Sequence, residues 1–124
     1  MNYTLVFIGG GLGSVTRLAF SKWFGTISNS FPLATLFANT VSSFLLGMLV
    51  GYFFSKQMSD SQTKFFVFAG TGFCGGFSTF STFSWETVQL FSSGKISLAV
   101  ANIFLSVTIS LAGVLAGYFV SKNF

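Results

Sequence analysis

Long runs of apolar residues, separated by short polar stretches, form the pattern of this sequence. Each run has or exceeds the roughly 20 residues that a helix needs to cross the hydrocarbon core of a bilayer. The stretches between them are rich in Ser, Gly, Asn or Lys, as connecting segments are. The pattern therefore predicts an all-α membrane protein, a single domain over residues 1–124 whose four transmembrane spans lie at about 3–24, 33–54, 65–91 and 96–120.

The composition agrees with a lipid environment and removes several classes of function. The chain is 52% hydrophobic and 6% charged, whereas soluble domains carry about 25% charged residues. It has no His, so Ser-His-Asp triads and imidazole metal sites cannot form. Its two acids, Asp60 and Glu86, are too far apart in sequence for a local carboxylate pair, and its six cations make no basic patch for nucleic acid. We expect neither an enzyme nor a nucleic-acid-binding protein.

The positions of the cations bear on how the chain inserts into the membrane. After four crossings both termini lie on one side, and the cations divide evenly between the two sides: Lys56, Lys64 and Lys122 with the termini, and Lys22, Lys95 and Arg17 opposite. An excess of positive residues normally sets the orientation, and three against three gives none. We therefore expect insertion in both orientations and an antiparallel twofold dimer of opposed copies. The alternative is that another factor, such as the N-terminal amine, sets one orientation.

Glycines four residues apart recur in three of the runs. Small residues at this spacing let two helices approach closely. They would serve the faces of an antiparallel dimer, and they could equally pack helices within one chain. The pairs are Gly9/Gly13, Gly47/Gly51 and Gly113/Gly117.

The third run contains an unusual segment, residues 70–86, in which four glycines in seven residues precede a series of Phe, Ser and Thr. Glycine disfavours continuous helix, so we expect a break near Gly75–Ser78, about halfway across the membrane. Backbone carbonyls freed at that depth must be buried in protein or bind water or an ion. Two interpretations follow: a cation site made of carbonyl oxygens, or a simple kink satisfied by Ser and Thr side chains.

After the expected break, Phe77, Phe80 and Phe83 recur every third residue, with hydroxyl side chains between them. On one helix this spacing places the rings on a slowly winding side. A phenyl ring has a positive edge, so ring edges alternating with hydroxyl donors indicate the wall of a narrow path for a small anion. The hydroxyl residues are Ser78, Ser81, Thr82 and Ser84.

The run from Gly72 to Ser84, followed by Glu86-Thr87-Val88, resembles the signature of the Fluc (CrcB) fluoride channels. The resemblance extends to Gly13–Arg17 in the first run and Thr35–Asn39 in the second, and to the four-span size. It implies a fluoride-selective channel in the cell membrane that lets toxic cytoplasmic fluoride leave passively. It also implies an antiparallel dual-topology homodimer with two fluoride pores and a central sodium ion that is structural and not transported.

The resemblance also implies roles for individual residues. Phe80 and Phe83 correspond to the paired phenylalanines whose ring edges line the pore, and Asn39 to an amide donor that reaches into it. Gly75 and Ser78 correspond to the residues whose backbone carbonyls hold sodium at the dimer axis. The hydroxyl positions of the fluoride path are Ser81, Thr82, Ser106 and Ser110.

The roles of three further residues, Arg17, Glu86 and Asn102, stay open. Arg17 lies well inside the first run, where an Arg is costly unless it faces water or a partner. It could be a vestibule cation that concentrates anions, or it could snorkel to the interface. Glu86 belongs near the end of the pore by resemblance, although an acid is an unexpected neighbour for an anion. Asn102 stands where some members of the family have Tyr, and its place in the pore stays open.

Two other functions suit a short four-span chain. A small dual-topology, proton-coupled exporter of lipophilic cations needs an acid in the first span, and this chain has none there. An accessory subunit without transport of its own would explain the size but not the polar segment after a break. The sequence therefore favours a passive fluoride channel, with fluoride, lipid and a second copy of itself as partners.

Overall fold

The computed structural model describes residues 1–25 and 30–124, and all of the regular structure in these two ranges is helical. Three of these helices are long and apolar enough to cross a membrane: α1 (Asn2–Gly25), α2 (Leu33–Phe53) and α6 (Ile96–Ser121). The prediction of an all-helical, membrane-embedded protein is confirmed.

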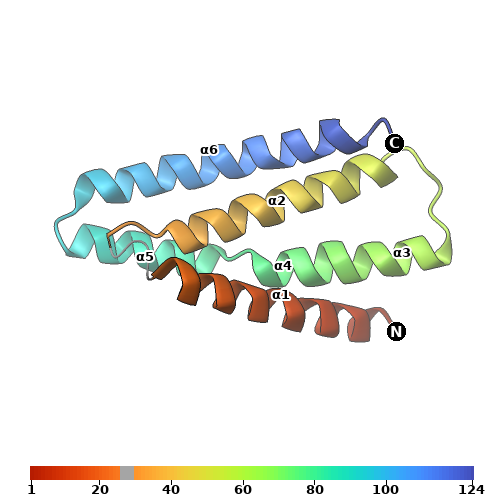
Figure 1. The fold of residues 1–124 in the computed structure, drawn as a ribbon, viewed down its shortest axis with the longest axis horizontal. Helices are drawn as coiled ribbons and strands as arrows, with labels where there is room; N and C mark the ends of the chain where they lie inside the picture. Colours follow the sequence, from red (N-terminus) through yellow and green to blue (C-terminus); the bar gives the residue numbers. More distant parts are fainter. Residues whose placement is uncertain (26–29) are drawn as a thin grey trace.

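The third apolar run forms an interrupted rod instead of one long helix. Its pieces are α3 (Asp60–Phe66), the π-helix η1 (Val67–Cys74), the short turn α4 (Gly75–Phe77) and α5 (Phe80–Ser92). A capping box at Ser59 starts the rod ahead of the apolar run. The pieces lie end to end along the bundle, with the interruption between α4 and α5 (Figure 1).

The helices form two closely packed pairs. α2 packs chiefly against α6, and α1 packs chiefly against η1 and α4. Both termini and the connection from α2 to α3 lie at one end of the bundle, and the connection from α5 to α6 lies at the other (Figure 1). The interruption in the rod lies about halfway along the bundle (Figure 1).

The glycine pairs bring helices of the same chain together. At each of these glycines, a Cβ would press against the backbone of the neighbouring helix: Gly9 on Phe68, Gly13 on Phe73, Gly47 on Val114, Gly51 on Tyr118, Gly113 on Thr40 and Gly117 on Phe44. Of the two uses expected from the sequence, packing within one chain is the one that the structure has. The other use, supply of dimer faces, is not open to these glycines, because helices of the same chain already occupy the space beside them.

Two glycines of the third run, Gly72 and Gly76, have the same task, and the helix continues past all four glycines before the break. The rod stays helical from Gly70 through Phe77. A Cβ at Gly76 would overlap the Gly10 carbonyl of α1, and one at Gly72 would crowd Gly9. The backbone of α1 leaves no room for a side chain at Gly72 and Gly76. The interruption comes after both glycines in the sequence.

Replacing Gly13 by Ala tests this packing. The new Cβ would overlap backbone atoms of Phe73 and Phe77, which cannot rotate away, and overpacking of this kind typically costs about 1–3 kcal/mol. We expect the free energy of unfolding of Gly13→Ala in mixed micelles to fall by about that amount.

The matched control is Gly11→Ala on the same helix, where a Cβ meets nothing within 4 Å. We expect its stability to equal or slightly exceed that of the original chain, because Ala favours helix over Gly. Equal stabilities of the two variants would contradict the close approach of α1 to η1 and α4.

Candidate functional site

The interruption in the rod consists of two residues, Ser78 and Thr79. Ser78 has φ −73° and ψ 157°, and Thr79 has φ −154° and ψ 120°, so both are extended. The break thus falls at the far edge of the range predicted from the sequence. α5 starts immediately afterwards, because the Thr79 side chain caps it by accepting a hydrogen bond from the Thr82 amide at 3.2 Å.

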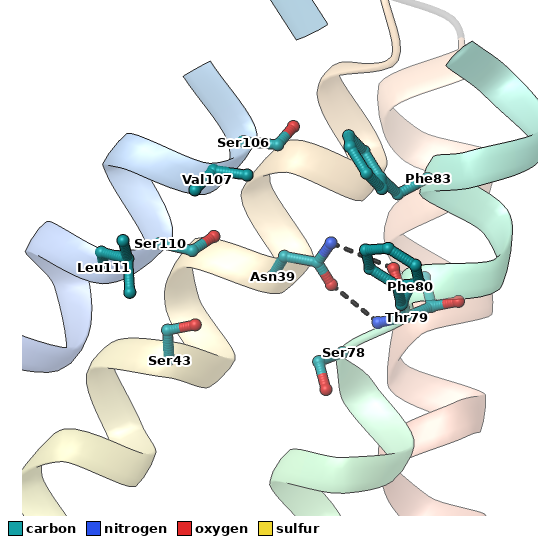
Figure 2. Close-up of a pocket in the computed structure, with 10 residues that line it drawn as sticks. All are labelled: Asn39, Ser43, Ser78, Thr79, Phe80, Phe83, Ser106, Val107, Ser110 and Leu111. Atoms are coloured by element: carbon teal, nitrogen blue, oxygen red, sulfur yellow. Dashed lines mark hydrogen bonds between the residues drawn. The ribbon is translucent and has the colours of Figure 1, made fainter. Parts of the chain in front are cut away.

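Asn39 of α2 satisfies the backbone of Thr79 on both sides. The Thr79 amide donates to Asn39 Oδ1 at 2.7 Å, and Asn39 Nδ2 donates to the Thr79 carbonyl at 3.1 Å (Figure 2). In a continuous helix the Thr79 amide would donate to the Gly75 carbonyl. The amide side chain therefore stabilises the break and leaves the Gly75 carbonyl without its helical donor.

Other carbonyls beside the break are bound by side chains from two helices. Ser42 of α2 donates to the Cys74 carbonyl at 2.7 Å, and Ser14 of α1 donates to the Gly76 carbonyl at 3.4 Å. The Cys74 carbonyl also keeps its helical donor, the Ser78 amide at 3.0 Å, so the expected kink satisfied by Ser side chains is present at Gly76. It does not extend to Gly75, so a carbonyl oxygen is left for another partner.

A cavity of about 300 Å³ opens beside the break (Figure 2). Its wall comes from α2, the break, α5 and α6, and its lining residues are Asn39, Ser43, Ser78, Thr79, Phe80, Phe83, Ser106, Val107, Ser110 and Leu111. The structure thus brings together five residues that the sequence assigned to a fluoride path, namely Phe80, Phe83, Asn39, Ser106 and Ser110. They come from three helices.

Two residues assigned to the path lie outside this lining. The hydroxyls of Ser81 and Thr82 lie 3.3 and 3.1 Å from the Thr79 hydroxyl. They form a hydroxyl cluster at the N-terminal end of α5. The sequence analysis did not select Thr79. Thr is a preferred N-cap residue, so its place just ahead of Phe80 was an available signal for the start of a helix.

Two phenyl rings stand at the cavity, and the third expected ring does not. The centroids of Phe80 and Phe83 lie 5.5 Å apart, with Phe80 78% exposed and Phe83 8% exposed. Phe77, at 2% exposed, packs against Phe20 of α1 instead. The prediction of a three-ring ladder is wrong at Phe77, because the break rotates the chain between residues 77 and 80.

The sequence matches the profile of a family described as CrcB-like protein, Camphor Resistance (CrcB), over residues 4–118. The chain belongs to the CrcB family. A relative named fluoride-specific ion channel FluC, from Pyrococcus horikoshii, is 43% identical over 119 residues, which cover 96% of this chain and 94% of the relative. Proteins of the same name from Leptospira interrogans and Escherichia coli are 41% and 42% identical, over 97% and 86% of this chain and 94% and 83% of their own lengths.

Arg17 of this CrcB chain reaches the break. Its Nη1 lies 3.4 Å from the Ser78 carbonyl, and its side chain is half-buried. The side chain is therefore directed at the protein, and snorkelling is not what the structure has. With Arg17 set aside, three lysines belong to the connection from α2, to α3 and to the C-cap of α6 (Lys56, Lys64 and Lys122), and two belong to the last turn of α1 and the N-cap of α6 (Lys22 and Lys95).

The acid of α5 in this CrcB chain is held by α2. Glu86 Oε1 accepts a hydrogen bond from Thr35 Oγ1 at 2.8 Å, and Oε2 is buried with no partner within residues 1–25 and 30–124. Glu86 is absent from the lining of the cavity at the break. Its carboxylate therefore lies on the side of α5 that faces Thr35.

Asn102 also lies outside the cavity lining. It is 1% exposed, and its Nδ2 donates to Thr87 Oγ1 of α5 at 2.9 Å. Ser106, which does line the cavity, donates to Asn102 Oδ1 at 3.2 Å. Thr87 was quoted from the sequence only as part of the family motif, and its contact with α6 has no signal in the sequence.

The hydrogen bonds of Asn39 lead to a prediction about the break. Asn39→Leu keeps most of the side-chain volume but removes both bonds to Thr79. Since a hydrogen bond of this kind contributes about 1 kcal/mol, we expect hydrogen exchange of the Thr79 amide to accelerate by about fivefold or more, measured by mass spectrometry or NMR.

Ser43→Ala is the control, because Ser43 lines the same cavity from the same helix. We expect its Thr79 amide to exchange at the original rate. Unchanged exchange in Asn39→Leu would mean that the break does not depend on this side chain.

Proposed function

We propose that this chain is a passive channel selective for fluoride. The observation that carries the proposal is the cavity at the break, where two phenyl rings, the amide of Asn39 and the first turn of α5 converge. The curated name of the relatives, fluoride-specific ion channel, supports the same conclusion. We also propose that the rod from α3 to α5 is the third of four spans.

The cavity has the chemistry that a small anion needs when it leaves water. The N-terminal turn of a helix carries positive partial charge and presents backbone amides, and α5, with 13 residues, begins at the break. The ring edges of Phe80 and Phe83 add positive potential without formal charge. Weak, neutral donors bind the ion well enough to replace its water and still let it leave, as conduction requires.

The absence of acids in α1 argues against the proton-coupled exporter. That mechanism exchanges protons for substrate at an acid in the first span, and residues 2–25 contain none. A passive pore is sufficient for fluoride removal, because HF that enters by diffusion dissociates at neutral pH and leaves fluoride trapped in the cytoplasm. Release of the ion then needs only a selective path across the membrane.

We propose that a second copy in the opposite orientation covers the cavity. The Phe80 ring is largely exposed, and extended backbone at membrane depth must be buried in protein or border water. A near-balanced count of end lysines supports insertion both ways. Two copies related by a twofold axis would carry two such cavities and therefore two pores. Side-specific labelling of Lys95 in intact vesicles tests the orientation, and labelling from one side alone would contradict it.

We further propose that a sodium ion joins the two copies through the carbonyls of Gly75 and Ser78. The chemistry of these two carbonyl groups fits a sodium ion in part. The Gly75 carbonyl lacks its helical donor, and the contact of the Ser78 carbonyl with Arg17 is long at 3.4 Å. A carbonyl oxygen has two lone pairs, so Ser78 can accept from both. The ion would supply positive charge to these oxygens, and two from each copy would surround it.

Fluoride efflux from liposomes tests the proposed function. With valinomycin present, we expect rapid fluoride release through the reconstituted protein and negligible chloride release, each followed with an ion-selective electrode. Phe80→Ile and Phe83→Ile keep the bulk but lose the ring edges, so both variants should release little fluoride while still forming dimers.

Phe91→Ile is the control, because Phe91 lies on α5 outside the cavity lining and is exposed. We expect its efflux to equal that of the original chain. Normal efflux through both pore variants would remove the argument from ring edges. Absence of fluoride release from dimeric original protein would overturn the channel itself.

Replacement of sodium tests the proposed metal site. In a large organic cation such as N-methylglucamine, which is too large for a site of four carbonyls, we expect the dimer to dissociate at a higher protein concentration than in sodium. The dimer fraction is measured by light scattering in detergent. Equal dissociation in the two cations would count against sodium at Gly75 and Ser78.

A further inference from the structure

A chain of hydrogen bonds behind the cavity connects α6 to α5. Its centre is Asn102, whose side chain is among the largest fully buried side chains of the described residues. A polar group buried in this way is costly unless it is hydrogen-bonded, and polar residues inside a membrane span are usually functional. Both partners of Asn102 belong to residues that are themselves buried, Thr87 at 7% and Ser106 at 6% exposure.

The direction of each bond in this chain follows from the donors available. The Thr87 hydroxyl has one proton and donates it to the Phe83 carbonyl at 2.8 Å. It can therefore only accept from Asn102, which must direct its NH₂ group to Thr87 at 2.9 Å. The amide oxygen then faces Ser106, which donates to it at 3.2 Å. The protons thus run in one direction, from Ser106 to the backbone of Phe83.

Both ends of the chain are residues that line the cavity. At one end, Thr87 links the turn of α5 that carries the Phe83 ring to α6. At the other end, the proton of Ser106 is committed to Asn102, so its hydroxyl presents lone pairs to the cavity. An anion in the cavity can receive a hydrogen bond from Ser106 only if that hydroxyl leaves Asn102.

We propose that Asn102 is a positioning residue of the fluoride site. Through Thr87 it holds the turn of α5 that carries Phe83, and through Ser106 it controls whether a wall hydroxyl donates to the ion. The inference rests on the proposed function and deepens it. The sequence left the place of Asn102 in the pore open, and in this proposal the side chain acts from behind the wall.

Thr87→Val tests the link to Phe83. Valine has almost the same shape but can neither accept from Asn102 nor donate to Phe83, and it leaves the buried Asn102 amide unpaired. We expect fluoride efflux per reconstituted dimer to fall about tenfold. Thr87→Ser restores the hydroxyl and should keep efflux within about twofold of the original chain.

Thr16→Val is the matched control. The Thr16 hydroxyl makes the same bond as Thr87, to the carbonyl four residues earlier at 2.8 Å, but on α1 and away from the cavity. We expect normal efflux from this variant. Efflux equal to the original chain in Thr87→Val, or an equal loss in Thr87→Val and Thr87→Ser, would overturn the positioning role.

Asn102→Leu tests the link to Ser106 and does not depend on Thr87→Val folding. It frees the Ser106 hydroxyl to donate to the ion, so the fluoride concentration at half-maximal efflux should fall severalfold. That fall should disappear in the double variant Asn102→Leu/Ser106→Ala. An unchanged half-maximal fluoride concentration in Asn102→Leu would contradict the proposal that Asn102 determines whether Ser106 donates to the ion. A purely structural role of Asn102 would change only the yield of folded dimer.

Hydrogen exchange of the amides around Phe83, measured on the same variants, does not require conduction. We expect faster exchange in Thr87→Val and Asn102→Leu than in Thr87→Ser and Thr16→Val. Equal exchange in all four would contradict the link from α6 to α5. Failure of the original chain to release fluoride would overturn the proposed function instead, and the two failures are thus distinguishable.

Discussion

Backbone groups in the middle of a membrane must have partners, and this requirement determines the structure around Thr79. Lipid offers no hydrogen bonds, so a helix can stop at this depth only where side chains replace its lost bonds. Asn39 does so for both the amide and the carbonyl of Thr79. The free Gly75 carbonyl follows from this pair of hydrogen bonds, and the Thr79 side chain then caps the start of α5. Without it, the third apolar run would gain by forming one continuous helix.

Two glycine-rich contacts bring the necessary side chains to the break. The close approach of α1 to η1 and α4 places Ser14 and Arg17 beside the carbonyls of Gly76 and Ser78. The close approach of α2 to α6 brings the two hydroxyl residues of α6 that line the cavity, Ser106 and Ser110, to the same cavity as Asn39. Van der Waals packing of this kind is the main force between helices in lipid. The cavity is thus a consequence of how tightly each pair packs.

Neutral groups line the cavity, and the charged side chains of the described residues stay outside its lining. Glu86 is hydrogen-bonded to Thr35, and Arg17 points at a carbonyl of the break. Neutral donors suit an ion that has to be released as well as bound, because a full positive charge in a region of low dielectric constant would hold fluoride strongly. The hydrogen-bond chain through Asn102 fits this arrangement, since it adjusts the wall without adding charge.

The sequence by itself determined the apolar runs, the helical class and the position of the break to within a few residues, because these depend on local composition and spacing. The resemblance to the family also pointed to Phe80, Phe83, Asn39, Ser106 and Ser110, which the structure brings to one cavity. Only the tertiary structure decided which glycines pack on which helices, because Gly-xxx-Gly has the same pattern for contacts within and between chains. It likewise decided that Phe77 turns to α1 and that Asn102 is hydrogen-bonded to Thr87 and Ser106 behind the cavity. These outcomes depend on the rotation of one helix against another, which is set by side chains distant in the sequence.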